Sequence, residues 1–289
     1  MRDRAPKRQR AAGAESASES KQTRAAPPGT ERRVGAVRIA DIPPAVLEDL
    51  NSGRIESASL AESLAVDFAA LLTHVMPRAD AARLAAIRAE RSITRRMPLA
   101  AALLLEALGP DADVQLRAHR SDTVRGWAAY AVALRPRLGL AARLDRIQPL
   151  ADDPNAGVRE WAWLALRPHI AAQIEIAIKL LSKWTAATSA NLRRFASEST
   201  RPRGVWCAHI ERLKNEPELG LPILAPLRAD PARYVQNSVA NWLNDAAKSR
   251  PDWVRGLCTE WNGRRPTAAT AYICRRAQRS LAPRSRPKK

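Results

Sequence analysis

The sequence predicts an all-α protein built as a HEAT-like helical-repeat solenoid, a curved superhelix of antiparallel helix pairs. Two observations carry this prediction: a short motif recurs along the chain, and apolar residues are spaced three or four positions apart. In addition, no segment alternates apolar and polar residues over a strand's length, and no glycine-rich phosphate loop follows a plausible strand. We therefore expect neither a parallel sheet nor a nucleotide cofactor.

The recurring motif is an aliphatic residue followed by arginine, with a bulky apolar residue three positions and a small one four positions after the first. Its starts are 34, 34, 43 and 38 residues apart, which is the period of paired-helix HEAT units. Each unit buries its apolar face only by stacking on its neighbours. The three clear copies and two looser ones are Val124–Ala128, Val158–Ala162, Leu192–Ala196, Val235–Val239 and Ile273–Ala277.

Before the repeats, the chain shows a helix start at Pro43-Pro44 and a stop at Asn51–Gly53. Apolar residues then recur at spacing four from residue 60 to residue 72, which predicts a helix with one apolar face. The four residues are Leu60, Leu64, Phe68 and Leu72.

Both ends of the chain are basic and poor in large apolar side chains. Residues 1–37 cannot offset the entropy of ordering, so we expect a disordered basic tail, and residues 283–289 form a similar C-terminal tail. Such tails could add non-specific phosphate contacts or only keep the protein in solution. Residues 38–282 are expected to form the helical-repeat domain.

The charge balance points to a polyanion partner. Lys and Arg number 48 against 29 acidic residues, a formal net charge of +19, and nucleic acid is the first candidate. A coding bias toward Ala and Arg is the plainer explanation, but the arginines also fall at repeated positions. No apolar run approaches the roughly 20 residues that span a bilayer, and no signal-peptide core is present, so a cytoplasmic, bacterial-type protein associated with the nucleoid is expected.

No metal or cofactor is expected. The three cysteines and four histidines have none of the spacings of zinc sites or disulfide frameworks. We interpret the cysteines as reduced and mostly buried and the histidines as structural. They are Cys207, Cys258 and Cys274, and His74, His119, His169 and His209.

One polar segment runs from Asn191 to Trp206. Its apolar residues make a buried face, whereas Arg194, Glu198 and Arg201 share another face at positions i, i+4 and i+7. Pro202 biases Arg201 away from helix, which places Glu198 in the last turn. A carboxylate among several arginines is expected to stay ionised at neutral pH. The plainer alternative is a salt bridge on a solvated helix face.

A second polar segment runs from Tyr234 to Asp245. Val235, Val239, Trp242 and Ala246 predict the packed stripe of a helix. A neighbouring stripe carries Asn237, Asn241, Asn244 and Asp245. Asparagine is a weak helix former, so its repeated use needs a reason. Hydrogen bonds between repeats and contacts to DNA in a concave groove are both compatible with it.

These segments resemble the AlkC branch of the AlkC/AlkD alkylpurine DNA glycosylases. The resemblance covers roughly residues 160–281, with weaker similarity at Leu50–Gly53 and Leu64–Phe68. It lies in Arg193-Arg194, Ala196–Glu198, Arg201–Arg203, Trp206, Tyr234–Gln236, Ser238–Asn241, Leu243–Asp245, Lys248 and Pro251-Asp252.

The resemblance implies a monomeric base-excision repair enzyme that holds duplex DNA on a basic concave face. It would hydrolyse the N-glycosidic bond of cationic 3-methyl- or 7-methylpurines without a metal. The residues matching the family's active site are Glu198, Trp206 and Asp245, of which Asp245 is expected to be the principal carboxylate. A gap between the two carboxylates is expected to admit a deoxyribose and a water. The residues expected to contact DNA are Arg193, Arg194, Arg201, Arg203, Asn237, Asn241 and Asn244.

The sequence departs from the AlkC pattern at one acid. Aligning an Arg-Pro pair of that pattern with Arg167-Pro168 puts Trp163 where the acid is expected. Glu160 lies one turn earlier on nearly the same face and could substitute as a catalytic residue, or the group could be lost. Trp161 and Trp163, two residues apart, cannot share a face. The alternative function is a non-catalytic HEAT scaffold that binds DNA or an acidic protein, and a regulatory subunit is a third.

Overall fold

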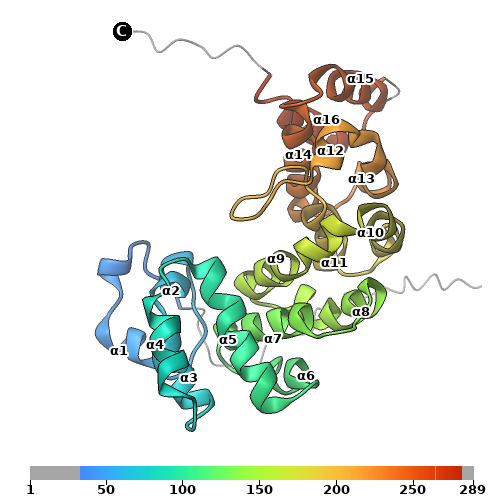
Figure 1. Cartoon of the computed structure of the whole chain (residues 1–289). Helices are drawn as coiled ribbons and strands as arrows, with labels where there is room; N and C mark the ends of the chain where they lie inside the picture. Colours follow the sequence, from blue (N-terminus) through green and yellow to red (C-terminus); the bar gives the residue numbers. More distant parts are fainter. Residues whose placement is uncertain (1–32, 264, 282–289) are drawn as a thin grey trace, which may run out of the picture. The chain divides into compact units, whose positions relative to one another are not determined.

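The computed structural model describes residues 33–263 and 265–281, and within them the chain folds into helices and connecting loops without a strand (Figure 1). The N-terminal helices are η1 (Ile39–Asp41), α1 (Pro44–Asn51), α2 (Leu60–Ala65), α3 (Phe68–Val75), α4 (Ala81–Ala89), α5 (Ile93–Leu108), α6 (Ala112–Leu116), α7 (Asp122–Leu134) and α8 (Leu140–Ala151). The C-terminal helices are α9 (Ala156–Ala172), α10 (Ile174–Leu181), η2 (Ser182–Ala186), α11 (Ala190–Ser199), α12 (Glu211–Asn215), η3 (Pro217–Gly220), α13 (Leu221–Leu227), α14 (Arg233–Ala247), α15 (Pro251–Asn262) and α16 (Ala268–Ala277).

Both predicted tails lie wholly or largely outside the described residues. Residues 1–32 and 282–289 are outside the described residues, and residues 34–37 have no regular secondary structure. The tails and the domain boundaries at residues 38 and 282 stay predictions.

The predicted repeat matches the way the helices stack. Helices α7, α9, α11, α14 and α16 pack against one another in that order and form a row of second helices. The first helices cover this row: α8 packs on α9, α13 on α14, and α15 on α14 and α16. Each of the first four motif copies begins at the third residue of its second helix, so sequence and stacking share one register.

The fifth copy is out of register. It was placed at Ile273, the sixth residue of α16, whereas the third residue is Thr270. Thr270, Ile273 and Cys274 are all buried and occupy the places of Val124, Trp127 and Ala128 in α7. The sequence comparison missed this because threonine replaces the aliphatic residue and no arginine follows it.

The single apolar face predicted over residues 60–72 is wrong, because this segment forms two helices. Asp67 starts α3 by accepting hydrogen bonds from the backbone N–H groups of Ala69 and Ala70. This N-cap separates α2 from α3, and Leu60 is left exposed. The predicted helix at Pro44–Asn51 is confirmed, with Gly53 just beyond it at φ 74°.

The packed faces of the second helices make the core. Val235, Val239, Trp242 and Ala246 are fully buried, as the stripe on α14 predicted. The Trp242 indole N–H donates to the backbone carbonyl of Thr200 at 2.9 Å and so joins α14 to the end of α11. The polar residues of the candidate site therefore extend from a rigid row of helices.

Candidate active site

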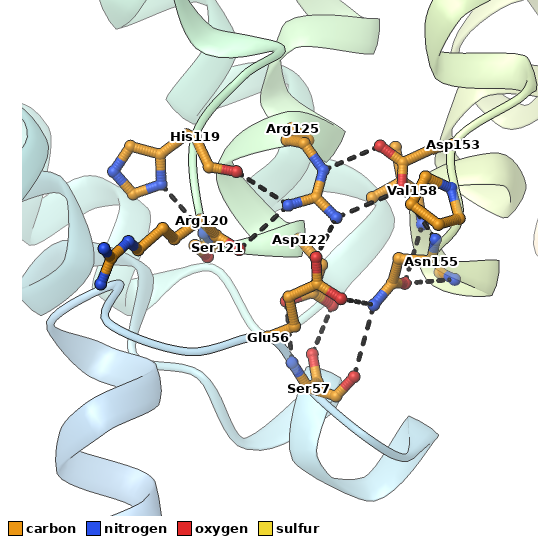
Figure 2. A network of polar contacts seen from close by, with 12 residues as sticks. Glu56, Ser57, His119, Arg120, Ser121, Asp122, Arg125, Asp153, Asn155 and Val158 are labelled. Atoms are coloured by element: carbon orange, nitrogen blue, oxygen red, sulfur yellow. Dashed lines mark hydrogen bonds and ion pairs between the residues drawn. The ribbon is translucent and has the colours of Figure 1, made fainter. Parts of the chain in front are cut away.

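A ladder of arginines joins consecutive repeats. In Figure 2 the guanidinium of Arg125 lies between repeats and donates through Nε to Asp153 Oδ2 at 2.8 Å. Its Nη1 donates to the backbone carbonyls of His119 and Arg120, and its Nη2 forms an ion pair with Glu56. All five N–H donors have acceptors, so this buried arginine is saturated within the protein.

Arg193 in α11 repeats the geometry of Arg125, two repeats further along the chain. Its Nε and Nη2 donate to the two oxygens of Asp230 at 2.6 and 3.0 Å, and its Nη1 donates to the carbonyls of Ala187 and Thr188. Arg193 was predicted to contact DNA. Its guanidinium is occupied by the next repeat, which favours a structural role, and its contact with DNA stays a prediction. Arg125 and Arg193 therefore bond an aspartate of the next repeat and join the repeats.

The residue after each ladder position is the fifth of its helix, and these residues form a polar row across the repeats. They are Gly126, Glu160, Arg194, Asn237 and Tyr272. Two pairs of neighbours in the row are bonded: Arg194 Nη2 lies 2.7 Å from Glu160 Oε1, and the Tyr272 hydroxyl donates to Asn237 Oδ1 at 2.6 Å. Glu198, four residues beyond Arg194, lies on the same face of α11.

Glu198 and Asp245 are joined by one arginine. Arg201 Nη1 donates to Glu198 Oε1 at 2.7 Å, while its Nε and Nη2 donate to Asp245 Oδ2 at 2.8 and 2.7 Å. Both carboxylates therefore contact the same guanidinium. The expected gap for a deoxyribose and a water is wrong, because the Arg201 guanidinium fills it.

The second oxygen of each carboxylate also has a partner. Glu198 Oε2 accepts from the Ser238 hydroxyl at 2.6 Å and lies 3.6 Å from Arg194 Nη2. Asp245 Oδ1 accepts from Lys248 at 3.1 Å. Both acidic side chains are only 5% exposed. They are therefore sealed beneath the surface that a substrate would meet.

Burial penalises the charged form of Glu198, but the attraction of Arg194 and Arg201 outweighs it and lowers the pKa of Glu198. This agrees with the expectation of an ionised carboxylate among arginines. Burial alone would have favoured the neutral acid, so it is the two guanidinium groups that favour the charged form of Glu198.

Glu160 is the accessible carboxylate of this region. Its side chain is 40% exposed, its Oε1 is paired with Arg194, and its Oε2 accepts from the Trp163 indole N–H at 2.7 Å. Trp163, which stands where the family pattern expects an acid, therefore orients the acid one turn earlier. Trp161 and Trp163 are both buried.

Tyr234 supports the arginines around Glu160. The Arg194 guanidinium stacks on its ring at 4.4 Å, and Arg159 Nε donates to its hydroxyl at 3.3 Å. Arg159 has the same motif position as Arg125 and Arg193 but lacks their aspartate partner. The next repeat has Ala187 at the position where Asp153 and Asp230 stand in the other repeats. The stacking keeps Arg194 in place between Glu160 and Glu198.

The three asparagines of α14 contact α16 or the residues that follow it. Besides the bond from Tyr272 to Asn237, Arg279 Nη2 donates to Asn241 Oδ1 at 2.9 Å. Asn244 is buried, and its amide nitrogen donates to the Ala277 carbonyl and the Ser280 hydroxyl. This geometry favours repeat packing over the predicted DNA contact for Asn244. Asn237 and Asn241 are partly exposed and remain available to a ligand.

The loop after α11 carries Trp206 and Arg203. Trp206 has φ 64° and is 51% exposed, and it makes no hydrogen bond or ring contact within the described residues. Its place in the active site stays a prediction. Arg203 Nη2 donates to the Ser249 hydroxyl. Arg167, which sequence reasoning did not single out, is buried and donates to the carbonyls of Ser199, Arg201 and Ala208, so it fixes the loop that carries Arg201.

Comparison with known proteins connects this region to DNA repair. Residues 156–276 match the family model described as DNA alkylation repair enzyme. The matched segment contains the row from Glu160 to Tyr272 together with Glu198, Arg201 and Asp245. YhaZ of Bacillus subtilis (strain 168), an uncharacterized protein, is 36% identical over 143 residues, which are 50% of this chain and 39% of YhaZ.

Solved structures share the helical-repeat fold. Alkylpurine DNA glycosylase AlkC of Pseudomonas fluorescens, bound to DNA containing an abasic site analogue, has 29% sequence identity and a TM-score of 0.60. The match covers 83% of this chain and 65% of AlkC, so this chain spans less than two thirds of either relative. AlkD2 of Streptococcus mutans has 18% identity and a TM-score of 0.54 over 66% of this chain and 91% of its own. The predicted fold class is confirmed.

None of the helices described for this chain combines the length and hydrophobicity needed to cross a membrane. Cys258 and Cys274 are buried free thiols, as predicted, and Cys207 is a partly exposed one.

Proposed function

We propose that the alkylation repair domain binds duplex DNA as a monomer and hydrolyses the N-glycosidic bond of cationic alkylpurines. The observation that carries the proposal is the exposed Glu160 carboxylate, held by Trp163 and Arg194 beside a buried, charged network. The match of residues 156–276 to the family model described as DNA alkylation repair enzyme supports it. AlkC, the 29% identical structure, is an alkylpurine DNA glycosylase bound to DNA with an abasic site analogue.

The chemistry needs little beyond a placed negative charge. An alkylated purine carries positive charge and leaves readily, so the enzyme must mainly stabilise the developing oxocarbenium ion and orient water. A carboxylate in contact with solvent can do both. Glu160 meets this requirement with its 40% exposed side chain.

The order of the candidate carboxylates is therefore revised. Asp245 was expected to be the principal one, but its side chain is only 5% exposed, whereas that of Glu160 is 40% exposed. In the proposal Glu160 faces the sugar, while Glu198 and Asp245 position Arg201. Arg194 and Arg203 remain the candidates for phosphate contacts near the site, and Trp206 remains a candidate for stacking on the substrate.

The second candidate function is a scaffold that binds DNA without excision. The observation that favours it is the sealing of both family-matched carboxylates by Arg201. This alternative shares the basic surface with the first candidate and differs only in the release of free base.

One experiment decides between them. The purified protein is incubated with methylated duplex DNA, and released bases and alkali-labile abasic sites are measured. If Glu160 stabilises only the transition state, Glu160→Gln lowers base release about a hundredfold, which corresponds to about 2.7 kcal/mol. Glu175→Gln, which changes a 70% exposed acid on α10, is the matched control.

The outcomes separate the residues as well as the functions. A larger loss with Asp245→Asn than with Glu160→Gln, in folded protein, restores Asp245 as the principal carboxylate. If none of these substitutions reduces the release of free base, the proposed active site is wrong. A wild type that binds duplex DNA and releases no base supports the scaffold.

A further inference from the structure

The last repeat carries a cluster of arginines around one tyrosine, here called the Tyr272 cluster. The guanidinium carbons of Arg233, Arg275 and Arg276 lie 3.7, 5.5 and 5.8 Å from the centre of the Tyr272 ring. Arg233 comes from α14 and the other two from α16, so the packing of these helices gathers the charges. Arg279 lies two residues beyond the C-terminal end of α16 and bonds Asn241.

These arginines differ from those of the inner repeats because they lack acidic partners. Arg194 and Arg201 each pair with two carboxylates. Over residues 33–263 and 265–281, no Asp or Glu forms an ion pair with the arginines of the Tyr272 cluster or with Arg279. Arg276 Nε is also buried without a hydrogen-bond partner. Burial and repulsion by Arg276 lower the pKa of Arg279 and outweigh the attraction of Asp245.

Tyr272 links these arginines to the polar row that contains residues of the candidate site. Tyr272 is the fifth residue of α16, the same place in its repeat as Glu160 and Arg194, and its hydroxyl is bonded to Asn237 in the same row. Stacking on the ring orders guanidinium groups that would otherwise repel one another. A dianionic or polyanionic surface would supply the missing counter-charge.

We propose that the Tyr272 cluster is a binding site for backbone phosphates of duplex DNA, beyond the carboxylates in the direction of the last repeat. The proposal rests on the proposed function for the choice of duplex DNA as the polyanion. Arginine forks suit phosphate oxygens, and each neutralised phosphate releases counterions, which makes the contribution measurable as salt dependence. The site would position DNA without taking part in the chemistry.

The test is the salt dependence of binding to a fluorescent duplex, followed by anisotropy. Arg233→Gln/Arg275→Gln changes two exposed residues and is expected to reduce the slope of log K against log salt by about 1.8, at about 0.9 per phosphate contact. Arg212→Gln/Arg255→Gln removes the same charge from exposed arginines that pair with Glu175, Glu216 and Asp252, and serves as the control. Arg276→Gln is a second cluster variant, and thermal unfolding checks that each protein is folded.

The outcomes distinguish this inference from the proposed function. Equal slopes for the cluster and control variants overturn the Tyr272 cluster as a phosphate site. This result does not bear on base release, which is measured separately. A reduced slope together with no base release by the wild type supports the cluster and contradicts the glycosylase. A wild type that does not bind duplex DNA overturns both.

Discussion

Replacing Arg193 by methionine tests whether the repeated arginines hold the repeats together. The substitution keeps a long side chain but removes four hydrogen bonds, two of them to Asp230, whose side chain is 3% exposed. Leaving one member of a buried pair uncompensated costs about 3–5 kcal/mol. Because Arg193 itself is 13% exposed, we expect a loss in the lower part of that range. Urea unfolding followed by circular dichroism measures it.

Two comparisons make the result specific to the pair. Arg255→Met breaks an exposed pair with Asp252 and should change stability by no more than about 1 kcal/mol. In a double-mutant cycle with Asp230→Asn, coupling of about 0.5–3 kcal/mol is expected for residues in direct contact. The salt slope of DNA binding should not change. The reasoning is refuted if Arg193→Met leaves stability within about 1 kcal/mol of wild type and reduces that slope by about one unit.

Three further predictions concern the same helices. The pKa of Glu198 is lowered in the folded protein, so the ionised side chain stabilises the fold at pH values above the ordinary pKa near 4.5. This stabilisation is lost as the pH falls through the folded pKa. Glu198→Gln should therefore reduce the loss of unfolding free energy on acidification, measured by urea titrations at several pH values. Gly126→Val should destabilise the protein by about 1–3 kcal/mol in the same assay, since even a Cβ would lie 2.8 Å from Met97 and Trp161, and an unchanged midpoint would contradict this packing. Asn244→Ala should cost about 1–3 kcal/mol and leave the salt slope unchanged, whereas a reduced slope in stable protein would restore Asn244 as a DNA contact.

Much of the candidate site could be predicted from the sequence, because its positions follow from helix periodicity. Glu198 in the last turn of α11, on one face with Arg194 and Arg201, needs only the 3.6-residue turn and the proline at 202. Tyr272 was missed only through the register of the last repeat. Starting that repeat at Thr270 places Tyr272 in the row of Glu160 and Arg194.

What the sequence by itself determined is the all-helical repeat, its register over four copies and the faces on which the polar residues lie, since these depend on residues three or four positions apart. Only the tertiary structure decided which charged side chains form ion pairs within the protein and which form none with the described acidic residues. Arg193 and Arg275 look alike in sequence, yet Asp230 of the next repeat saturates the first. Likewise Arg201 reaches 44 residues along the chain to Asp245 and closes the space beside Glu198, while Glu160 stays exposed. Charge pairing of this kind is set by how repeats stack, and no local pattern encodes it.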